Sequence, residues 1–512
     1  MVKQFFVRLC VLCALCVKKF LAEITHTEHR LHREEVQILM RVSRLLSTRS
    51  RCVVCLVLLL LVSCKHRSAA EFVSIKDPVI ALTHVRVIDG TGAPAREDQT
   101  IIIESGRITS IGPTSQTPVP ASANSLDLSD HTAIPGLVGM HNHLFYSTDG
   151  GERDVLATES FAPLYLAAGV TTIRTAGALN LRKDLAIKKS VDKGELAGPK
   201  IHLSSPYINR RVGQVLSPER ITELINEWAE QGVTSLKVYE NISRAELISV
   251  VDVAHKKGLK VTGHTCAIGF TDAAQAGIDN LEHGLAVDTE FFSRKKVDEC
   301  PNRSEWLPEL AGIQISSEPV QELIRELVQR RVAITSTLAI FEAFVSEKFQ
   351  LDPRMQDVLS EDAYADCVSR LSDGRADPRW SRVWEVMLKK EMQFEREFVK
   401  AGGLLMAGVD PTGWGGVVAG FGDQRNVELL VAAGFSPEEA IRIATLNGAT
   451  FLGEADRIGT LAAGKHADIV IVRGNPSSNI ADVRNVRFVF KDGIGYDPVK
   501  LIESVRGLVG DK

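Results

Sequence analysis

The sequence predicts an α/β fold: a (β/α)8 TIM barrel with a small β-sandwich domain built from the N- and C-terminal segments. Eight runs rich in Val, Ile and Thr alternate with helical patterns between residues 136 and 454. Short alternating strands with tight turns occur at both ends of the chain. The Gly-rich phosphate fingerprint of an open doubly wound sheet is absent, which favours the barrel.

The two β-rich ends are expected to form one domain, with residues 79–135 as its first part and residues 455–512 as its second. In the first part, "DGTG" and "ESGR" interrupt alternating β-branched residues, a pattern typical of antiparallel strands. Residues 459–476 and 486–498 have the same texture. Because chain termini often lie near each other, the two pieces can share one sheet.

The barrel is predicted over residues 136–454. Its strands are expected at 136–143, 170–175, 200–205, 234–239, 260–264, 280–284, 332–337 and 404–410. Helices between them carry start signals, such as Ser243 with Glu246 in a capping box and Ser-Pro pairs at Ser217 and Ser436. Residues 285–331 and 340–402 are long insertions, which we expect to cover the catalytic face of the barrel.

Residues 1–63 form a leader and residues 64–78 a linker in this interpretation. Four arginines precede the apolar run of residues 52–62, which is too short to span a membrane and is typical of an export signal. The run ends in "LVSC", which resembles the lipobox of bacterial lipoproteins. We therefore expect an exported protein, lipid-anchored through Cys64 to a bacterial membrane and facing the periplasm or cell exterior. Met40 is an alternative translation start, and a buried or anchoring apolar helix with a chance cysteine is the alternative to a signal.

Charge and cysteine content exclude some classes of protein. A formal net charge of -4 over 512 residues gives no field that would recruit nucleic acid. Six of the nine cysteines lie at or before Cys64, and the three that remain are too few for a disulfide scaffold. A bridge between Cys300 and Cys367, in the two insertions, is one alternative; two unpaired thiols are expected. Cys266 is expected to be a wall residue rather than an extra metal ligand.

Metal-compatible side chains stand at the ends of five predicted strands. In "GMHNH", His141 and His143 are two residues apart on a strand, so both point to the same side. The other strand ends carry Lys237, His264, His283 and Asp410. A single one of these would more often be structural, but their shared place at one rim predicts a metal site.

This set resembles the amidohydrolase superfamily, in particular its imidazolonepropionase-like and Xaa-Pro-dipeptidase-like branch. The residues that carry the resemblance are "PGLVGMHNH", the β-rich ends and "GTLAAGKHADIVI". The resemblance implies that His141, His143, Lys237, His264, His283 and Asp410 take metal-binding places. It also implies two metal ions, because single-metal members usually lack the lysine on strand four.

Lysine can join such a site only after its charge is removed. Burial beside dications depresses the amine pKa, and the neutral amine can then add carbon dioxide to give a carbamate on Lys237 that bridges both ions. The alternative is an ammonium group paired with an acid at the rim. Imidazole and carboxylate ligands without thiolate suit Zn2+, and manganese, cobalt or iron are alternatives.

Candidate substrate-binding residues follow the strand ends on the same rim. They are Arg174, Tyr207, Arg210 and Tyr239, with Arg211 and Trp414 as further candidates. An arginine fork suits a substrate carboxylate, as in a dipeptide or an N-acyl amino acid. For each arginine, a solvated surface charge is the alternative.

The sequence thus predicts a metal-dependent hydrolase that cleaves a C–N amide bond of a small molecule, which is a cyclic amide, a dipeptide or an N-acyl amino acid. A metal-bridging hydroxide attacks the carbonyl, and Asp410 carries the proton to the leaving nitrogen. The alternatives are an ester or lactone hydrolase, a mononuclear deaminase and a non-enzymatic binding protein. A homo-oligomer is compatible with the sequence.

Overall fold

The computed structural model describes residues 68–209, 216–376 and 378–511. The chain divides into two compact units, residues 1–67 and residues 68–512, and the second is described below. The predicted signal, its cysteine Cys64 and the candidate residues Arg210 and Arg211 lie outside the described residues. Among the helices of the described part, none combines the length and the apolar character that crossing a membrane requires.

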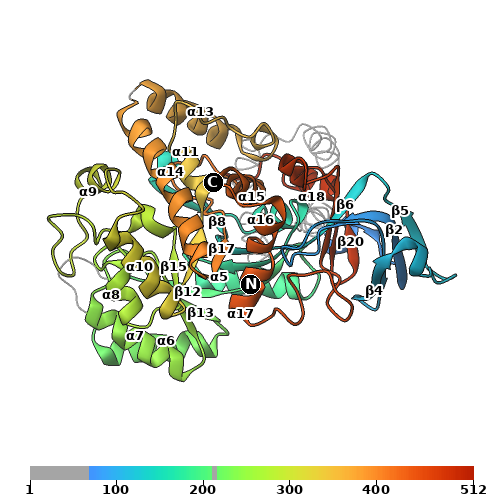
Figure 1. The fold of residues 1–512 in the computed structure, drawn as a ribbon, viewed down its shortest axis with the longest axis horizontal. Coiled ribbons are helices and arrows are strands. Elements are labelled where there is room, and N and C mark those ends of the chain that lie inside the picture. Colours follow the sequence, from blue (N-terminus) through green and yellow to red (C-terminus); the bar gives the residue numbers. More distant parts are fainter. Residues whose placement is uncertain (1–67, 210–215, 377, 512) are drawn as a thin grey trace, which may run out of the picture. The chain divides into compact units, whose positions relative to one another are not determined.

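Both ends of the described chain contribute to one nine-stranded sheet, as the sequence predicts (Figure 1). Its strands follow the order β1 (Val73–Ile75), β20 (Ile494–Tyr496), β19 (Val486–Lys491), β18 (Ile469–Arg473), β6 (His131–Pro135), β2 (Val79–Val87), β3 (Arg96–Glu104) and β4 (Arg107–Pro113), and β5 (Asn124–Asp127) pairs with β2. The antiparallel pair of β18 and β6 joins the two ends, with Ile471 opposite Ala133.

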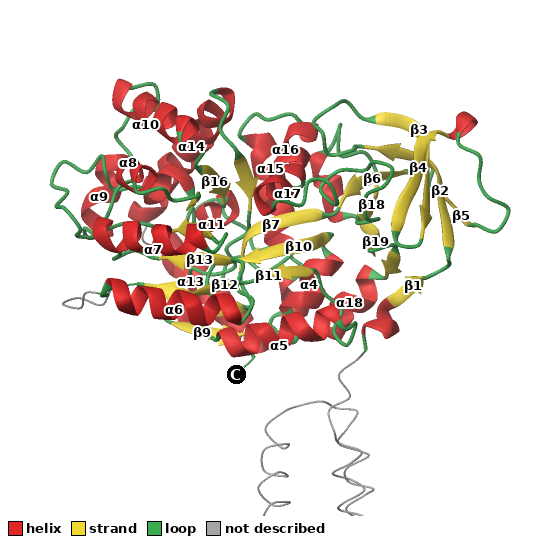
Figure 2. Ribbon diagram, turned by 90° about the horizontal axis from the view of Figure 1, so that it is seen from below, coloured by secondary structure: helices red, strands yellow, loops and turns green. Residues whose placement is uncertain are grey.

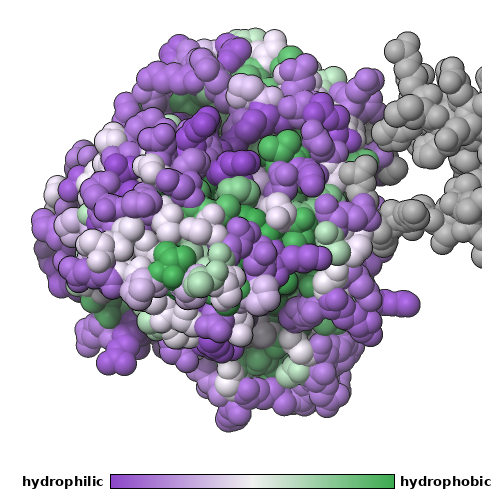
Figure 3. All heavy atoms as spheres, turned by 90° about the vertical axis from the view of Figure 1, so that its right-hand side faces the viewer, coloured by the Kyte–Doolittle hydropathy of each residue, from purple (hydrophilic) through white to green (hydrophobic). Residues whose placement is uncertain are grey.

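One face of this sheet has a hydrophobic core of its own, because successive side chains of a strand point to opposite faces and Ile469 and Ile471 of β18 share one of them. The side chains of Ile80, Leu82, Ile101 and Ile103 are buried in it together with Ile469 from the far end of the chain. Figure 3 shows this side of the molecule, where hydrophilic residues dominate and hydrophobic ones lie in small groups.

The predicted linker differs from the structure in its second half. Residues 69–72 form the short helix η1 (Ala69–Phe72), and residues 73–75 are the edge strand β1. Phe72 is buried, and β1 pairs with β20 near the end of the chain. The prediction of a linker fails here because burial of Phe72 and Ile75 stabilises an ordered segment.

Parallel strands appear at all eight predicted positions. Figure 2 shows several of them, among them β7, β10 and β13. They form two sheets, one with β7 (Leu137–Asn142), β10 (Val170–Thr175) and β11 (Lys200–His202), the other with β12 (Ser204–Ile208), β13 (Ser235–Val238), β14 (Lys260–Gly263), β15 (Asn280–Glu282), β16 (Ala333–Ser336) and β17 (Leu405–Ala407). The third predicted strand is divided into β11 and β12 at Leu203.

Backbone hydrogen bonds connect the last strand region to the first. The N–H groups of Val409 and Asp410 both donate to the carbonyl oxygen of His141, at 3.1 and 2.9 Å. The segment after β17 is therefore fixed directly beside the end of β7. This contact brings the first and the last predicted metal-binding residues together.

Helices flank the parallel strands (Figures 1 and 2). They are α4 (Phe161–Ala167), α5 (Leu181–Asp192), α6 (Pro218–Glu230), α7 (Arg244–Lys256), α8 (Phe270–Gln275), α15 (Phe421–Ala432), α16 (Pro437–Ile443), α17 (Leu446–Leu452) and the C-terminal α18 (Pro498–Ser504). The predicted caps are confirmed: the side chains of Ser217, Ser243 and Ser436 each accept a backbone N–H in the first turn. Short elements complete this part, namely η2 (Thr114–Gln116), the hairpin β8 (Phe145–Thr148) and β9 (Arg153–Leu156) with η3 (Asp149–Gly151), and η5 (Ile480–Arg484).

The two insertions are mainly helical. The first holds η4 (Gly284–Val287), α9 (Arg303–Leu310) and α10 (Glu318–Gln329), and the second α11 (Leu338–Ala343), α12 (Met355–Val358), α13 (Glu361–Ala376) and α14 (Arg379–Lys400). In α14, Trp384, Met387, Phe394 and Phe398 recur at helical spacing and are buried. Through this stripe α14 packs mainly against η4 and α11, and it also contacts β17.

Candidate metal centre

Three predicted ligands converge most closely. His141, His143 and Asp410 are buried, and each offers one ligand atom within 4.8 Å of the other two. The Nε2 atoms of His141 and His143 lie 3.6 and 3.2 Å from Asp410 Oδ1. Among the described residues, His143 Nδ1 has no hydrogen-bond partner although it is buried. Two imidazoles and a carboxylate gathered in this way fit a divalent ion.

Asp410 occupies the centre of this cluster. Its carboxylate also lies 3.8 Å from His283 Nδ1 and accepts a hydrogen bond from Thr412 Oγ1 at 2.8 Å. Burial alone would raise the pKa of Asp410, but the neighbouring histidines outweigh it and hold the pKa well below its usual range. The carboxylate is therefore ionised, as a metal ligand must be.

His283 and His264 continue the histidine cluster. The ring centroid of His283 lies 4.4 Å from that of His141 and 4.7 Å from that of His264. Burial lowers the pKa of His264 to about 3 and that of His283 well below its usual range, so both rings are neutral. Neutral imidazole is the form that binds metal.

Backbone strain accompanies two of these residues. His283 has φ 69° and Asp410 has φ 49°, in the left-handed region that non-glycine residues rarely adopt. His283 directly follows β15, and Asp410 lies three residues after the end of β17. His283 is held by a hydrogen bond of 2.8 Å between Nδ1 and Thr337 Oγ1. Such strain is stored at functional sites, where the surrounding structure enforces it.

Lys237 lies in the interior beside a carboxylate. Its Nζ is 3.5 Å from Glu282 Oε1, and in the described part of the chain it makes no hydrogen bond although the side chain is buried. Burial lowers the pKa of Lys237, and Arg174 adds to this while Glu282 opposes it. This placement fits both readings of the lysine, a modified amine and an ammonium paired with an acid.

Glu282 is a central residue that the sequence reasoning missed. Its carboxylate accepts hydrogen bonds from His141 Nδ1 and from Arg174 Nη2, the latter at 2.9 Å. Burial would raise the pKa of Glu282, but Arg174, His141 and Lys237 together lower it well below the usual range. The bond to Nδ1 leaves His141 Nε2 facing Asp410, which is the orientation that a ligand needs. Its position next to His283 in "NLEHG" was the available signal.

Arg174 differs from its predicted role in substrate binding. Its guanidinium is fully buried and donates hydrogen bonds to the carbonyl oxygen of Met140 and to Glu282. Among the described residues that line the cavity above the strand ends, Arg174 is absent. The reason is its position on β10, where the side chain points into the interior beneath the strand ends. Arg174 thus neutralises Glu282 and orients it. The prediction that Arg174 binds the substrate is wrong.

All six predicted metal-binding residues line one cavity of about 780 Å³. The predicted Tyr207 and Tyr239 also line it, with ring centroids 5.0 Å apart. Both insertions contribute to the wall, as expected from their place in the sequence. The aromatic part of that wall from the insertions consists of Trp306, Phe341, Phe344 and Trp384. Phe344 and Phe341 both stack on Trp384, with centroid distances of 4.8 and 5.4 Å.

Two other predictions have different outcomes. Trp414 donates from Nε1 to the carbonyl oxygen of Ala343 at 3.1 Å and is outside the described cavity wall. Cys300 forms a disulfide with Cys266, so the expectation of an unpaired thiol is wrong for Cys300, and so is the alternative of a Cys300–Cys367 bridge. Cys367 is a free, buried thiol, as expected. The Cα atoms of Cys266 and Cys300 are 4.9 Å apart because the first insertion folds back over the end of β14.

The chain matches the amidohydrolase family over residues 132–293 and 394–494, just over half of its length. It belongs to the amidohydrolase family. This family is metal-dependent, and the cluster of His141, His143 and Asp410 is a metal site of the expected composition. The match includes every one of the six predicted metal-binding residues and leaves out most of both insertions.

Curated relatives are similar over limited segments. An enamidase of Eubacterium barkeri is 29% identical over 204 residues, covering 37% of this chain and 50% of that enzyme. Adenine deaminase 2 of Jannaschia sp. (strain CCS1) is 38% identical over 79 residues, 15% of this chain and 13% of that protein. The matched parts therefore span half or less of these relatives.

Solved structures of similar fold cover more of the chain. A Xaa-Pro dipeptidase with bound methionine aligns with a TM-score of 0.61 at 20% identity, over 82% of this chain and 100% of that one. Phenylurea hydrolase B gives a TM-score of 0.61 at 20% identity, with 85% and 100% covered. With the family, these likenesses show a TIM-barrel-type α/β fold for the amidohydrolase.

Proposed function

We propose that this protein is a metal-dependent hydrolase that cleaves a C–N amide bond of a small molecule. The observation that carries the proposal is the convergence of His141, His143, Lys237, His264, His283 and Asp410 on one cavity. These side chains offer imidazole, carboxylate and amine groups and no thiolate, which suits Zn2+. The cavity volume of about 780 Å³ is in the range of sites for small ligands.

In this proposal the cluster would hold two ions, and Lys237 would join the ligands as a carbamate. The buried Nζ of Lys237 makes no hydrogen bond among the described residues, although it lies 3.5 Å from Glu282 Oε1. This unmet hydrogen-bonding need supports a modified lysine. When bound, divalent ions supply Lewis-acid activation of water and of the amide carbonyl.

Proton transfer is assigned to Asp410. Its Oδ1 lies within 3.6 Å of both His141 and His143, so the carboxylate faces the centre of the cluster. There it can take a proton from the attacking water and pass it to the leaving nitrogen, which an amide requires because its amine leaves poorly unprotonated. Tyr207 and Tyr239, whose pKa values are raised by burial, remain protonated donors on the wall.

The proposal is tested by metal removal. Chelation of the purified full chain should abolish hydrolysis of dipeptides, N-acyl amino acids or hydantoin-like rings, and added Zn2+ or Mn2+ should restore it, since the ligands alone cannot activate water. Lactones serve as the comparison substrates. Turnover of lactones alone would favour the ester-hydrolase alternative, and amide hydrolysis that persists in fully metal-free protein would overturn the proposal.

The Lys237→Ala change tests the number of ions. Metal analysis should find about two ions per chain in the unmodified protein and about one in the variant, because the bridging ligand is lost. The same measurement separates this proposal from a mononuclear deaminase, which needs no ligand at Lys237. Two ions per chain in the alanine variant would contradict the carbamate.

We also propose four features of the fold and location of this protein. They are a closed (β/α)8 barrel, a β-sandwich formed by the terminal strands, export, and lipid anchoring through Cys64 toward the periplasm or cell exterior. The hydrogen bonds of Val409 and Asp410 to His141 support closure of the barrel. Mass spectrometry of membrane-extracted protein tests the anchor, since a polypeptide that begins before Cys64 would contradict it.

A further inference from the structure

The first insertion places a basic side chain on the cavity wall. Among the described wall residues, Arg303 and Lys237 are the two lysines or arginines, and Lys237 is enclosed beside Glu282. Arg303 is 53% exposed at the side chain. Its ion pair with Glu240 has a separation of 4.0 Å, longer than a hydrogen bond, and its guanidinium donates no hydrogen bond within the described part of the chain. The guanidinium is therefore available to a ligand.

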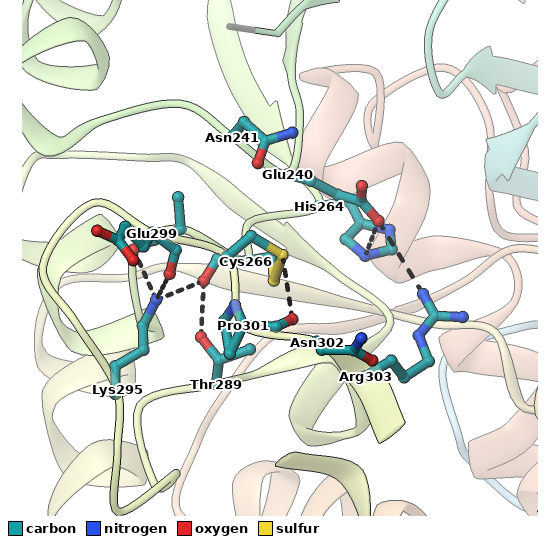
Figure 4. Close-up of a disulfide and its surroundings, with 12 residues drawn as sticks. Glu240, Asn241, His264, Cys266, Thr289, Lys295, Glu299, Pro301, Asn302 and Arg303 are labelled. Carbon is teal, nitrogen blue, oxygen red and sulfur yellow. Dashed lines mark hydrogen bonds and ion pairs between the residues drawn. A yellow bond between two sulfur atoms is a disulfide. The ribbon is translucent and has the colours of Figure 1, made fainter. Parts of the chain in front are cut away.

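The position of Arg303 relative to the metal centre is set through Glu240. Glu240 Oε1 lies 3.9 Å from His264 Nε2 and 4.0 Å from Arg303 Nη2, as Figure 4 shows. One carboxylate oxygen thus separates the guanidinium from an imidazole of the metal centre. In an N-acyl amino acid, three covalent bonds separate the scissile carbonyl carbon from the carboxylate carbon, so such a ligand needs the partner of its carboxylate near the metal centre.

A dense set of contacts fixes the segment that carries Arg303. The disulfide between Cys266 and Cys300 ties it to the loop after β14, three residues before Arg303. Lys295 Nζ donates to the carbonyl oxygens of Cys266, Ala267 and Glu299 at 2.8, 2.7 and 2.6 Å (Figure 4). Asn302 caps α9, so Arg303 occupies the first helical position. A tethered guanidinium loses less freedom on binding than a mobile one.

We infer that Arg303 binds the carboxylate of the substrate, and that the Cys266–Cys300 disulfide positions it for this. The inference rests on the proposed amide-hydrolase function and narrows its substrates to amides whose leaving amine belongs to an amino acid. Planar guanidinium matches a carboxylate with two parallel hydrogen bonds, and the substrate carboxylate replaces Glu240 as its partner. The aromatic wall of Phe341, Phe344 and Trp384 favours apolar groups elsewhere on the ligand.

Binding and turnover are measured separately. Calorimetry on the metal-loaded full chain compares N-acetylphenylalanine with its uncharged amide, N-acetylphenylalaninamide. The acid should bind roughly 10- to 100-fold more tightly, as expected for a hydrogen bond to a charged group. Arg303→Gln should remove this difference, and Arg303→Lys should restore part of it. In turnover, the loss should appear in KM more than in kcat.

Arg294→Gln is the matched control. Arg294 belongs to the same insertion, pairs with Glu305 at 2.9 Å and is absent from the described cavity wall. This variant should keep the preference for the acid. An unchanged preference in Arg303→Gln, or an equal loss in Arg294→Gln, overturns the inference. Absence of all amide hydrolysis alongside an Arg303-dependent preference in binding overturns the proposed function and leaves only the carboxylate-binding role of Arg303.

The Cys300→Ser variant tests the disulfide. Loss of the tether should reduce the preference for the acid by several-fold in the same calorimetric comparison. In the Arg303→Gln background the same change should have little further effect on the preference, because the two act on one interaction. An additive loss in the double variant contradicts the positioning role.

Discussion

Asp410→Asn is expected to lower kcat by about 10²- to 10⁴-fold, the usual contribution of a positioned acid–base group. The amide of Asn cannot take up the proton that Asp410 is assigned to move, although it has nearly the same shape. Oδ1 also stands within 3.6 Å of two imidazoles, so the change removes the negative charge at the centre of the histidine cluster. Steady-state kinetics with an N-acyl amino acid, together with metal analysis, measures both effects.

Asp154→Asn provides the comparison for Asp410. Asp154 lines the same cavity but accepts a hydrogen bond from Ser147 Oγ at 2.7 Å and is exposed. Its replacement should change kcat by less than about tenfold, below the range of a positioned acid–base group. An Asp410→Asn variant that retains its metal and turns over at the unmodified rate would exclude Asp410 as the proton carrier.

The strand-end residues could be predicted because position and chemistry agree. A strand alternates its side chains with period two, so His141 and His143 must share a side wherever the strand lies. Asp410, His264 and His283 each end a run of β-forming residues, and parallel strands present their carboxyl ends at one rim. Sequence alone therefore indicates which residues converge, and the structure adds the distances between them.

The interior charges could not be predicted because they depend on neighbours across strands. Arg174 was assigned to the rim on the basis of its strand end, but nothing local shows that its side chain turns toward Glu282. Glu282 in turn stands beside His283, and an imidazole at a strand end is the stronger sequence signal for a metal ligand. A buried ion pair is specified by what faces it, and that information lies in β10 and β15 together.

The disulfide and Arg303 belong to a segment with few local signals. Cys266 and Cys300 are 34 residues apart, and their pairing depends on how the insertion folds over β14. Periodicity predicts neither the path of a long connection nor which wall it lines. The division of the third strand could not be predicted either. At this point the N–H of Ser204 donates to Thr175 Oγ1 on β10, a contact between strands that the local sequence does not show.

Glu282→Gln is expected to destabilise the fold by about 3 to 5 kcal/mol, the cost of breaking a buried ion pair. Arg174 would keep its charge in the interior without the carboxylate that lies 2.9 Å from it. His141 would also lose the acceptor for Nδ1, and metal affinity should fall by about 10- to 100-fold. Urea denaturation and metal titration measure the two losses.

Two further measurements distinguish the loss of the Glu282–Arg174 ion pair from a general effect of substitution. One is the dependence of stability on pH, and the other is a matched variant at Glu395. The pKa of Glu282 is held below its ordinary value of 4.5, so its contribution to stability is present above pH 4.5 and is lost only as pH falls further. Glu395 is equally buried, but burial raises its pKa to about 8, so at pH 7 it is largely protonated. Glu395→Gln should therefore cost much less than Glu282→Gln at pH 7. Equal losses in the two variants would show that Glu282 does not act as the counter-ion of Arg174.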